Sequence, residues 1–189
     1  MPSIGEPSRQ LPELKAAEEE VKAIATFLNT EAIIGDQATR EDIVRELPQA
    51  RLIHLATHGL LDDIKQLGIP GAIALAPSGE DNGWLTAGEI LERFASSQGI
   101  PLHAHLAVLS ACVTGLGKIT GDGVIGLSRC FMAAGVPSLV VSLWQVDDVS
   151  TTFLMIKFYE NLLTHQNVAN ALKEAQWALL VSVWKRGLY

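Results

Sequence analysis

Leu52-Ile53-His54-Leu55-Ala56-Thr57-His58-Gly59 is an apolar run that stops at a histidine, and Leu106-Ala107-Val108-Leu109-Ser110-Ala111-Cys112 is a second run that stops at a cysteine. Both runs have the length of a buried β-strand. In a parallel sheet, side chains at the carboxyl ends of neighbouring strands meet in one crevice. A histidine and a cysteine that meet there can act as base and nucleophile. The two runs therefore predict the skeleton of a cysteine peptidase, with His58 and Cys112 as its catalytic pair.

Helical and strand patterns alternate around these two runs. Thr39 and Thr86 each precede a helical pattern and carry an acidic residue three positions on, Asp42 and Glu89, which is typical of a helix start. Strands that alternate with helices indicate a sheet covered on both faces. We therefore predict an α/β fold, a three-layer α/β/α sandwich with a mainly parallel sheet. The expected helices span about 14–28, 39–47, 87–94, 123–134, 150–163 and 168–180, and the further strands span 32–34, 72–75 and 138–144.

The length and charge of the chain narrow its class. Its 189 residues are the size of one domain. The net charge of −7 and the pI near 5.2 argue against nucleic-acid binding, which leaves a basic footprint. No apolar stretch has the length of a membrane span, and the amino terminus lacks the pattern of a signal peptide. We expect no nucleic-acid or membrane partner.

The two cysteines are Cys112 and Cys130, too few for a disulfide framework. Both are interpreted as thiols in a reducing compartment, so we expect a cytoplasmic protein. Cys130 lies inside a helical pattern and is interpreted as a core residue, because free cysteine is among the most buried residue types. Cys112 ends its strand instead, before a loop that begins Val113-Thr114-Gly115.

The segments His54-Leu55-Ala56-Thr57-His58-Gly59 and Leu109-Ser110-Ala111-Cys112-Val113-Thr114-Gly115 resemble the two signatures of CHAT domains. These form a caspase-like peptidase family often joined to tetratricopeptide repeats. Residues 121–129, 133–138 and 142–148 also resemble the family. The resemblance covers about residues 11–180 as one domain, with 1–10 as a flexible segment and 181–189 as an atypical tail.

The resemblance implies a caspase-like sandwich and an oxyanion hole made by the backbone amides of Gly59 and Cys112. It also implies a protein or peptide substrate, a possible tetratricopeptide-repeat partner and no cofactor. Position 113 is valine where the family commonly has aspartate. The family's first strand region and its last, tryptophan-containing strand are missing or altered, which predicts exposed sheet edges. The alternative function is therefore an inactive caspase-like module that only binds a partner.

Three residues after the last strand pattern are candidates for substrate binding. Asp147 and Asp148 could form an acidic pocket in the same crevice and favour a basic substrate residue. The alternative is that they cap the helix that follows them. Trp144 is either a wall of the cleft or part of the core.

Two other kinds of site were weighed. His54 lies four residues before His58, but on a strand the two are about 13 Å apart and cannot share one metal ion, so we expect no metal site. Gly121-Asp122-Gly123-Val124-Ile125-Gly126 matches a dinucleotide-binding motif. That motif should follow its strand at once, whereas here it begins nine residues after Cys112. Dinucleotide binding is kept as a remote alternative.

Overall fold

The computed structural model describes residues 14–60, 71–112, 121–142, 146–165 and 167–185. Their centre is a five-stranded sheet with the order β3-β2-β1-β4-β5. The strands β1 (Leu52–Leu60), β4 (Leu106–Cys112) and β5 (Leu139–Val141) pair in parallel. The short strands β2 (Ala72–Ala74) and β3 (Trp84–Thr86) pair antiparallel, and β2 joins β1 antiparallel.

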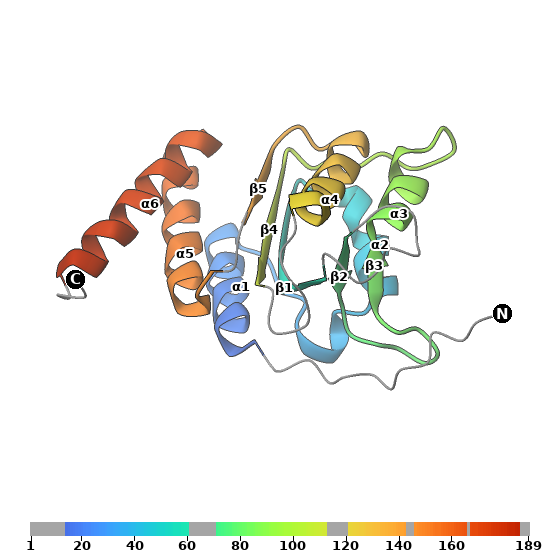
Figure 1. Cartoon of the computed structure of the whole chain (residues 1–189), viewed down its shortest axis with the longest axis horizontal. Coiled ribbons are helices and arrows are strands. Elements are labelled where there is room, and N and C mark those ends of the chain that lie inside the picture. Colours follow the sequence, from blue (N-terminus) through green and yellow to red (C-terminus); the bar gives the residue numbers. More distant parts are fainter. Residues whose placement is uncertain (1–13, 61–70, 113–120, 143–145, 166, 186–189) are drawn as a thin grey trace.

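Helices cover both faces of the sheet, as Figure 1 shows. On one face lie α1 (Lys15–Leu28) and α5 (Asp148–His165), and α6 (Val168–Lys185) packs on the outside of α5. On the other face lie α2 (Arg40–Glu46), α3 (Ala87–Ile90) and α4 (Gly121–Ala133). The predicted three-layer α/β/α sandwich with a mainly parallel sheet is therefore confirmed. None of the helices among these residues is long and apolar enough to cross a bilayer.

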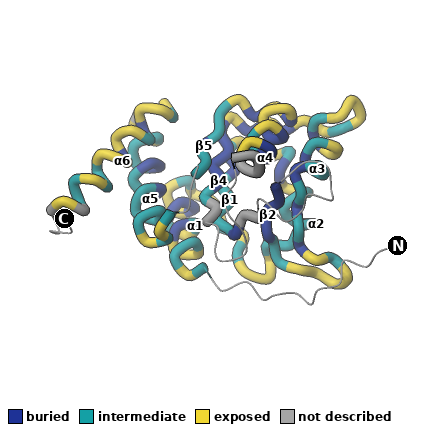
Figure 2. Tube along the Cα trace, in the orientation of Figure 1, coloured by how far each residue is buried: buried dark blue, intermediate teal, exposed yellow. Residues whose placement is uncertain are grey.

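Each face of the sheet has its own apolar core (Figure 2). Alternate residues of β4 point to opposite faces, as the strand period of two requires: Leu106 and Val108 belong to one core, Ala107 and Leu109 to the other. The core on the α1 side contains Ile24, Leu106, Val108, Val140, Met155, Phe158, Tyr159, Ala171 and Ala175. The core on the α4 side includes Ile53, Ile73, Leu85, Ile90, Phe94, Leu109, Leu127, Cys130 and Phe131.

The two predicted helix caps are present. The Asp42 backbone N–H donates to Thr39 Oγ1 over 3.2 Å, and the Glu89 backbone N–H donates to Thr86 Oγ1 over 3.1 Å. Each bond satisfies one of the amides that a helix start leaves without an intrahelical partner. The hydroxyl of Thr39 also donates to the Asp42 carboxylate over 2.6 Å, which helps to lower the pKa of that carboxyl group.

Some element boundaries differ from the expectation. The segment 32–34 was predicted as a strand, but it forms no sheet ladder and leads into a 3-10 turn at Gly35–Gln37. Among the described residues, the first backbone bridge to the sheet region joins Thr39 to Ala76. Helix α6 continues to Lys185, five residues beyond its predicted end, because 181–185 keeps the helical hydrogen bonding.

One partly buried ion-pair group supports the α4 side of the sheet. The Arg40 Nε donates to Asp81 Oδ2 over 2.6 Å, and its Nη1 donates to Glu89 Oε1 over 2.7 Å. The guanidinium of Arg40, together with the backbone N–H of Gly83, lowers the pKa of Asp81. These contacts tie α2 to the β2–β3 hairpin and to α3.

Arg40→Gln is expected to lower the free energy of unfolding at pH 7 by about 1–2 kcal/mol, because it leaves the partly buried Asp81 without its basic partner and Glu89 with Arg93 alone. The Asp81 part of this loss is present above its unfolded pKa of about 3.9 and disappears as the pH falls through its lower folded pKa. Urea unfolding at pH 7 and pH 3 measures both values. The matched control is Arg45→Gln: Arg45 is 60% exposed, so its ion pairs are screened by water and its loss should be much smaller. Equal losses at the two arginines would contradict the account.

Candidate active site

His58 and Cys112 are direct neighbours in the sheet. The strands β1 and β4 pair in unbroken parallel register from Leu52 opposite Leu106 to His58 opposite Cys112. Adjacent strands lie about 4.8 Å apart. The two residues therefore share one register position at the carboxyl ends of two parallel strands.

The imidazole of His58 lies on the face of the sheet that α1 and α5 cover. On β1, Leu52 and His54 contact the α1-side core or its polar groups, whereas Ile53 and Leu55 belong to the α4 side. The strand period of two carries this pattern on to His58. His58 is buried, with 6% of its surface exposed. A buried imidazole interacts more strongly with a nearby charge than an exposed one, because the local dielectric is low.

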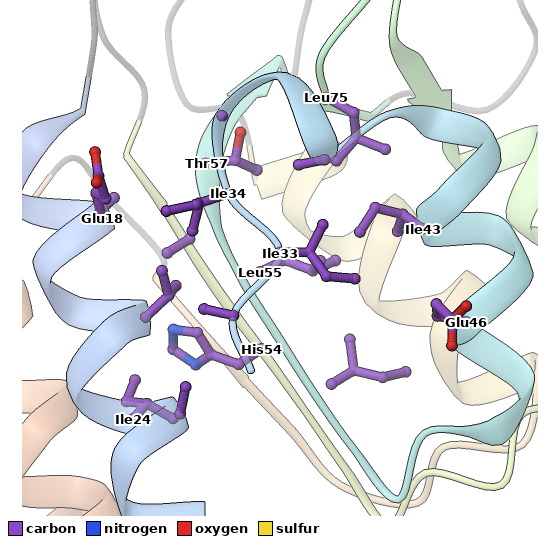
Figure 3. Close-up of a pocket in the computed structure, with 18 of the residues that line it drawn as sticks. Glu18, Ile24, Ile33, Ile34, Ile43, Glu46, His54, Leu55, Thr57 and Leu75 are labelled. Atoms are coloured by element: carbon purple, nitrogen blue, oxygen red, sulfur yellow. The ribbon is translucent and has the colours of Figure 1, made fainter. Parts of the chain in front are cut away.

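A pocket of about 870 Å³ opens beside β1 and reaches both His54 and His58. Helix α1, the segment 30–36 and α2 form its walls, and side chains of β1 line it (Figure 3). On the side of β1 away from β4, the described residues pair with β1 only at Gly59 and Leu60, so the pocket borders the earlier part of the strand. The lining is mostly aliphatic and includes Ile24, Ile33, Ile34, Ile43, Leu55 and Leu75, while Glu18 and Glu46 also line it.

The acidic pair after β5 lies at the start of α5. The Ser150 backbone N–H donates to Asp147 Oδ2 over 2.9 Å, which lowers the pKa of Asp147. Asp148 is the first residue of the helix. This is the capping arrangement that the sequence allowed. A role of Asp147 and Asp148 in binding a basic substrate residue stays a prediction, and Trp144 lies outside the described residues.

Cys130 has the surroundings of a core residue. It is 2% exposed among the apolar side chains of the α4-side core, and burial raises the pKa of its thiol. A thiol with a raised pKa forms little thiolate at neutral pH and is a poor nucleophile. Cys130 is therefore a suitable internal control for experiments on Cys112.

A buried polar cluster next to this site was missed in the sequence. His54 was weighed only as a metal ligand, but its Nε2 lies 2.9 Å from Glu20 Oε1 and its Nδ1 lies 3.1 Å from the Tyr159 hydroxyl. Glu20 is 2% exposed and Tyr159 is fully buried. The available signal was the position of Glu20: it lies on the apolar stripe of the first helix, three residues after Ala17 and four before Ile24.

The glycine motif at 121–126 does not have the structure that dinucleotide binding requires. Its residues form the first turns of α4, whereas the motif should form the turn between a strand and a helix. The dinucleotide alternative therefore lacks its structural context.

The sandwich, with a histidine and a cysteine ending two adjacent parallel strands, has the caspase-like architecture. The sequence model of the CHAT domain matches residues 3–183, so the chain belongs to the CHAT domain family. Tetratricopeptide repeat protein 28 of Homo sapiens is 28% identical to it over 186 residues, covering 86% of this chain and 8% of the relative. The protein of the same name from Mus musculus is 27% identical over 186 residues, with the same coverage. The chain thus spans a small part of the curated relatives it matches.

Proposed function

We propose that this chain is a caspase-like cysteine endopeptidase domain that cleaves protein substrates with His58 and Cys112. The observation that supports the proposal is the register: His58 and Cys112 are Cα partners on adjacent parallel strands. Acyl transfer needs a nucleophile and a base within reach of one carbonyl carbon. Carboxyl ends of parallel strands are where such groups converge.

In the proposed reaction, His58 takes the proton of the Cys112 thiol, and the sulfur attacks the peptide carbonyl carbon. The backbone amides of Gly59 and Cys112 stabilise the negative oxygen of the tetrahedral intermediate. The C–N bond then breaks, and His58 gives its proton to the leaving amine. A water molecule deprotonated by His58 hydrolyses the thioester, which releases the acid and restores the thiol.

The pocket beside β1 supports a substrate with an apolar side chain near the cleaved bond. It reaches His58, it is lined mainly by aliphatic side chains, and the carboxylates of Glu18 and Glu46 also line it, each paired with a basic neighbour, Lys22 or Arg45. An apolar residue with a basic neighbour fits this lining. Asp147 and Asp148 are also proposed to favour a basic residue of the substrate. Two cysteines used as thiols fit a reducing, cytoplasmic compartment.

A thiol-directed peptide probe tests the proposal. We expect the probe to label Cys112 and to leave the buried Cys130 unlabelled, as peptide mapping by mass spectrometry would show. His58→Ala should slow labelling of Cys112 by about 10²–10⁴-fold, the usual contribution of a general base. Equal labelling of the two cysteines, or no effect of His58→Ala, would contradict the proposal.

A second candidate function is an inactive interaction module, and the outer face of α6 favours it. Trp177, Leu180 and Trp184 lie three and four residues apart on this helix and are 68%, 57% and 76% exposed. Figure 2 shows how much of α6 is exposed at the edge of the molecule. Large exposed apolar groups in one stripe mark a protein-binding surface. The partner we propose is a tetratricopeptide-repeat region, because the relatives carry that name.

The double variant Trp177→Glu, Trp184→Glu is expected to weaken binding to a purified tetratricopeptide-repeat segment by more than about tenfold, since tryptophan is a frequent binding hot spot. Calorimetric titration measures the affinity. The matched control is Phe27→Glu, which changes another partly exposed apolar residue, on α1 (38% exposed). Unchanged binding of the double variant would rule out this face of α6.

A further inference from the structure

Glu20 of α1, His54 of β1 and Tyr159 of α5 form a hydrogen-bonded chain inside the core on the α1 side. Both ring nitrogens of His54 are engaged, at 2.9 Å from Glu20 Oε1 and 3.1 Å from the Tyr159 hydroxyl. The rings of His54 and Tyr159 also meet edge to face, with their centroids 5.4 Å apart. Three elements distant in sequence are thus joined at one point of the sheet.

The chemistry of the three side chains determines which group donates each of the two hydrogen bonds. A neutral imidazole has one donor and one acceptor nitrogen, and an ionised carboxylate only accepts. With a neutral imidazole, the Nε2 of His54 carries the hydrogen that Glu20 accepts, and the Tyr159 hydroxyl donates to Nδ1. Burial and the negative charge of Glu20 raise the pKa of Tyr159 well above its usual range, so the phenol remains a donor. The pattern fixes both the tautomer and the orientation of His54.

Polar contacts join helix α1 to the sheet and to α5. Glu20 ties the middle of α1 to β1, and the hydroxyl of Thr152 on α5 donates to the Ala16 carbonyl in the first turn of α1 over 3.0 Å. Glu18, which lines the pocket beside β1, forms an ion pair with Lys22 on the same helix. The inner face of α1 is also one wall of the pocket that reaches His54 and His58. In Figure 3 His54 lies beside Ile24 of α1 at the edge of that pocket.

His54, the central residue of the cluster, lies on the same strand as His58 of the candidate dyad. His54 and His58 are four residues apart on β1, so both are on the face that α1 covers, with the small Ala56 between them. The partners of these three residues on β4 are Val108, Ser110 and Cys112. A shift of α1 or a twist of β1 at His54 would therefore be transmitted along a short, regular strand to His58.

We propose that Glu20, His54 and Tyr159 are a buried latch: they hold α1 over β1 and thereby position His58 relative to Cys112. The inference deepens the proposed peptidase function and rests on it. The three side chains are positioning residues, since they act through His58. A catalytic pair needs its geometry held to a fraction of an ångström by supporting hydrogen bonds. The hydrogen bonds to His54, near the start of β1, supply such support.

The test uses two nearly isosteric variants of the full chain, Tyr159→Phe and Glu20→Gln. Two properties are measured against pH: the NMR titration of the His58 ring, and the alkylation rate of Cys112 by iodoacetamide. We expect both variants to move the His58 titration midpoint by at least about 0.5 pH unit. We also expect alkylation of Cys112 near pH 7 to slow at least about threefold, and amide hydrogen exchange in α1 to quicken.

The control is Phe131→Leu, which weakens the core on the opposite face of the sheet without touching the latch. It should lower stability and leave the His58 midpoint unchanged. If the two latch variants keep the parent's midpoint, or if Phe131→Leu moves it equally, the latch is overturned. Failure of the peptidase proposal looks different: the alkylation of Cys112 in the parent is then independent of His58, while the His58 titration and α1 exchange still report on the latch.

Discussion

Cys112→Ala is expected to lose all peptide hydrolysis above the uncatalysed background while the protein remains folded. The substitution removes the nucleophile, and the remaining base and amides cannot form the thioester. Only one sulfur atom at a strand end is lost, so the free energy of unfolding should fall by no more than about 1–2 kcal/mol. Cleavage of an apolar–basic peptide library, followed by mass spectrometry, measures the activity, and circular dichroism checks the fold.

Cys130→Ala is the matched control for that loss. It removes the same sulfur atom from the core on the α4 side, where the thiol is buried. Activity per folded molecule should persist, and stability should fall by about 1 kcal/mol or more through the small cavity. Equal activity of the Cys112→Ala variant and the parent would contradict the assignment of the nucleophile.

Phe158→Ala is expected to cost about 3–5 kcal/mol of unfolding free energy. Phe158 is fully buried between α5 and the sheet and meets the ring of Tyr159 edge to face, with centroids 5.2 Å apart. Whole domains are stable by only about 5–15 kcal/mol, so this variant should be partly unfolded at 37 °C. Urea unfolding followed by tryptophan fluorescence measures the loss.

The control for Phe158 is Phe27→Ala on α1, where the ring is 38% exposed. Its expected loss is clearly smaller than that of Phe158→Ala, because more than a third of the residue is already in contact with water. Equal losses at the two phenylalanines would show that the α1-side core does not hold α5 on the sheet.

The fold was predictable because its strong elements carry local signals. The runs that became β1 and β4 are continuously apolar, as strands buried on both faces must be. Thr39 and Thr86 marked two helix starts through capping chemistry that needs only residues three positions away. Alternating strands and helices then fixed the layered architecture.

The remaining elements depend on contacts that no local pattern records. Strand β3 is only three residues long, Trp84–Thr86, and it exists because β2 pairs with it. The segment 32–34 has strand-like residues, yet whether it joins the sheet depends on distant pairing. The role of Glu20 is also non-local, because its partner His54 lies 34 positions away in sequence.

One part of the candidate site could be predicted from the sequence and another part could not. The adjacency of the strands that end in His58 and Cys112 follows from the parallel topology, and the structure pairs these residues in register. The pocket beside β1 could not be predicted, because its walls come from α1, α2 and the segment between them. Asp147 was a candidate for substrate binding. In the structure its carboxylate accepts a hydrogen bond from the backbone N–H of Ser150, at the start of α5.

The most direct measurement of the central claim is the pH dependence of Cys112 alkylation in the parent and in His58→Ala. If the two residues form a working pair, the parent should react with a midpoint well below the ordinary cysteine value of about 8.5, because the imidazolium stabilises the thiolate. The His58→Ala midpoint should return to about 8.5 or above. Identical profiles for the two proteins would contradict a functional pair and leave the interaction module as the function of this domain.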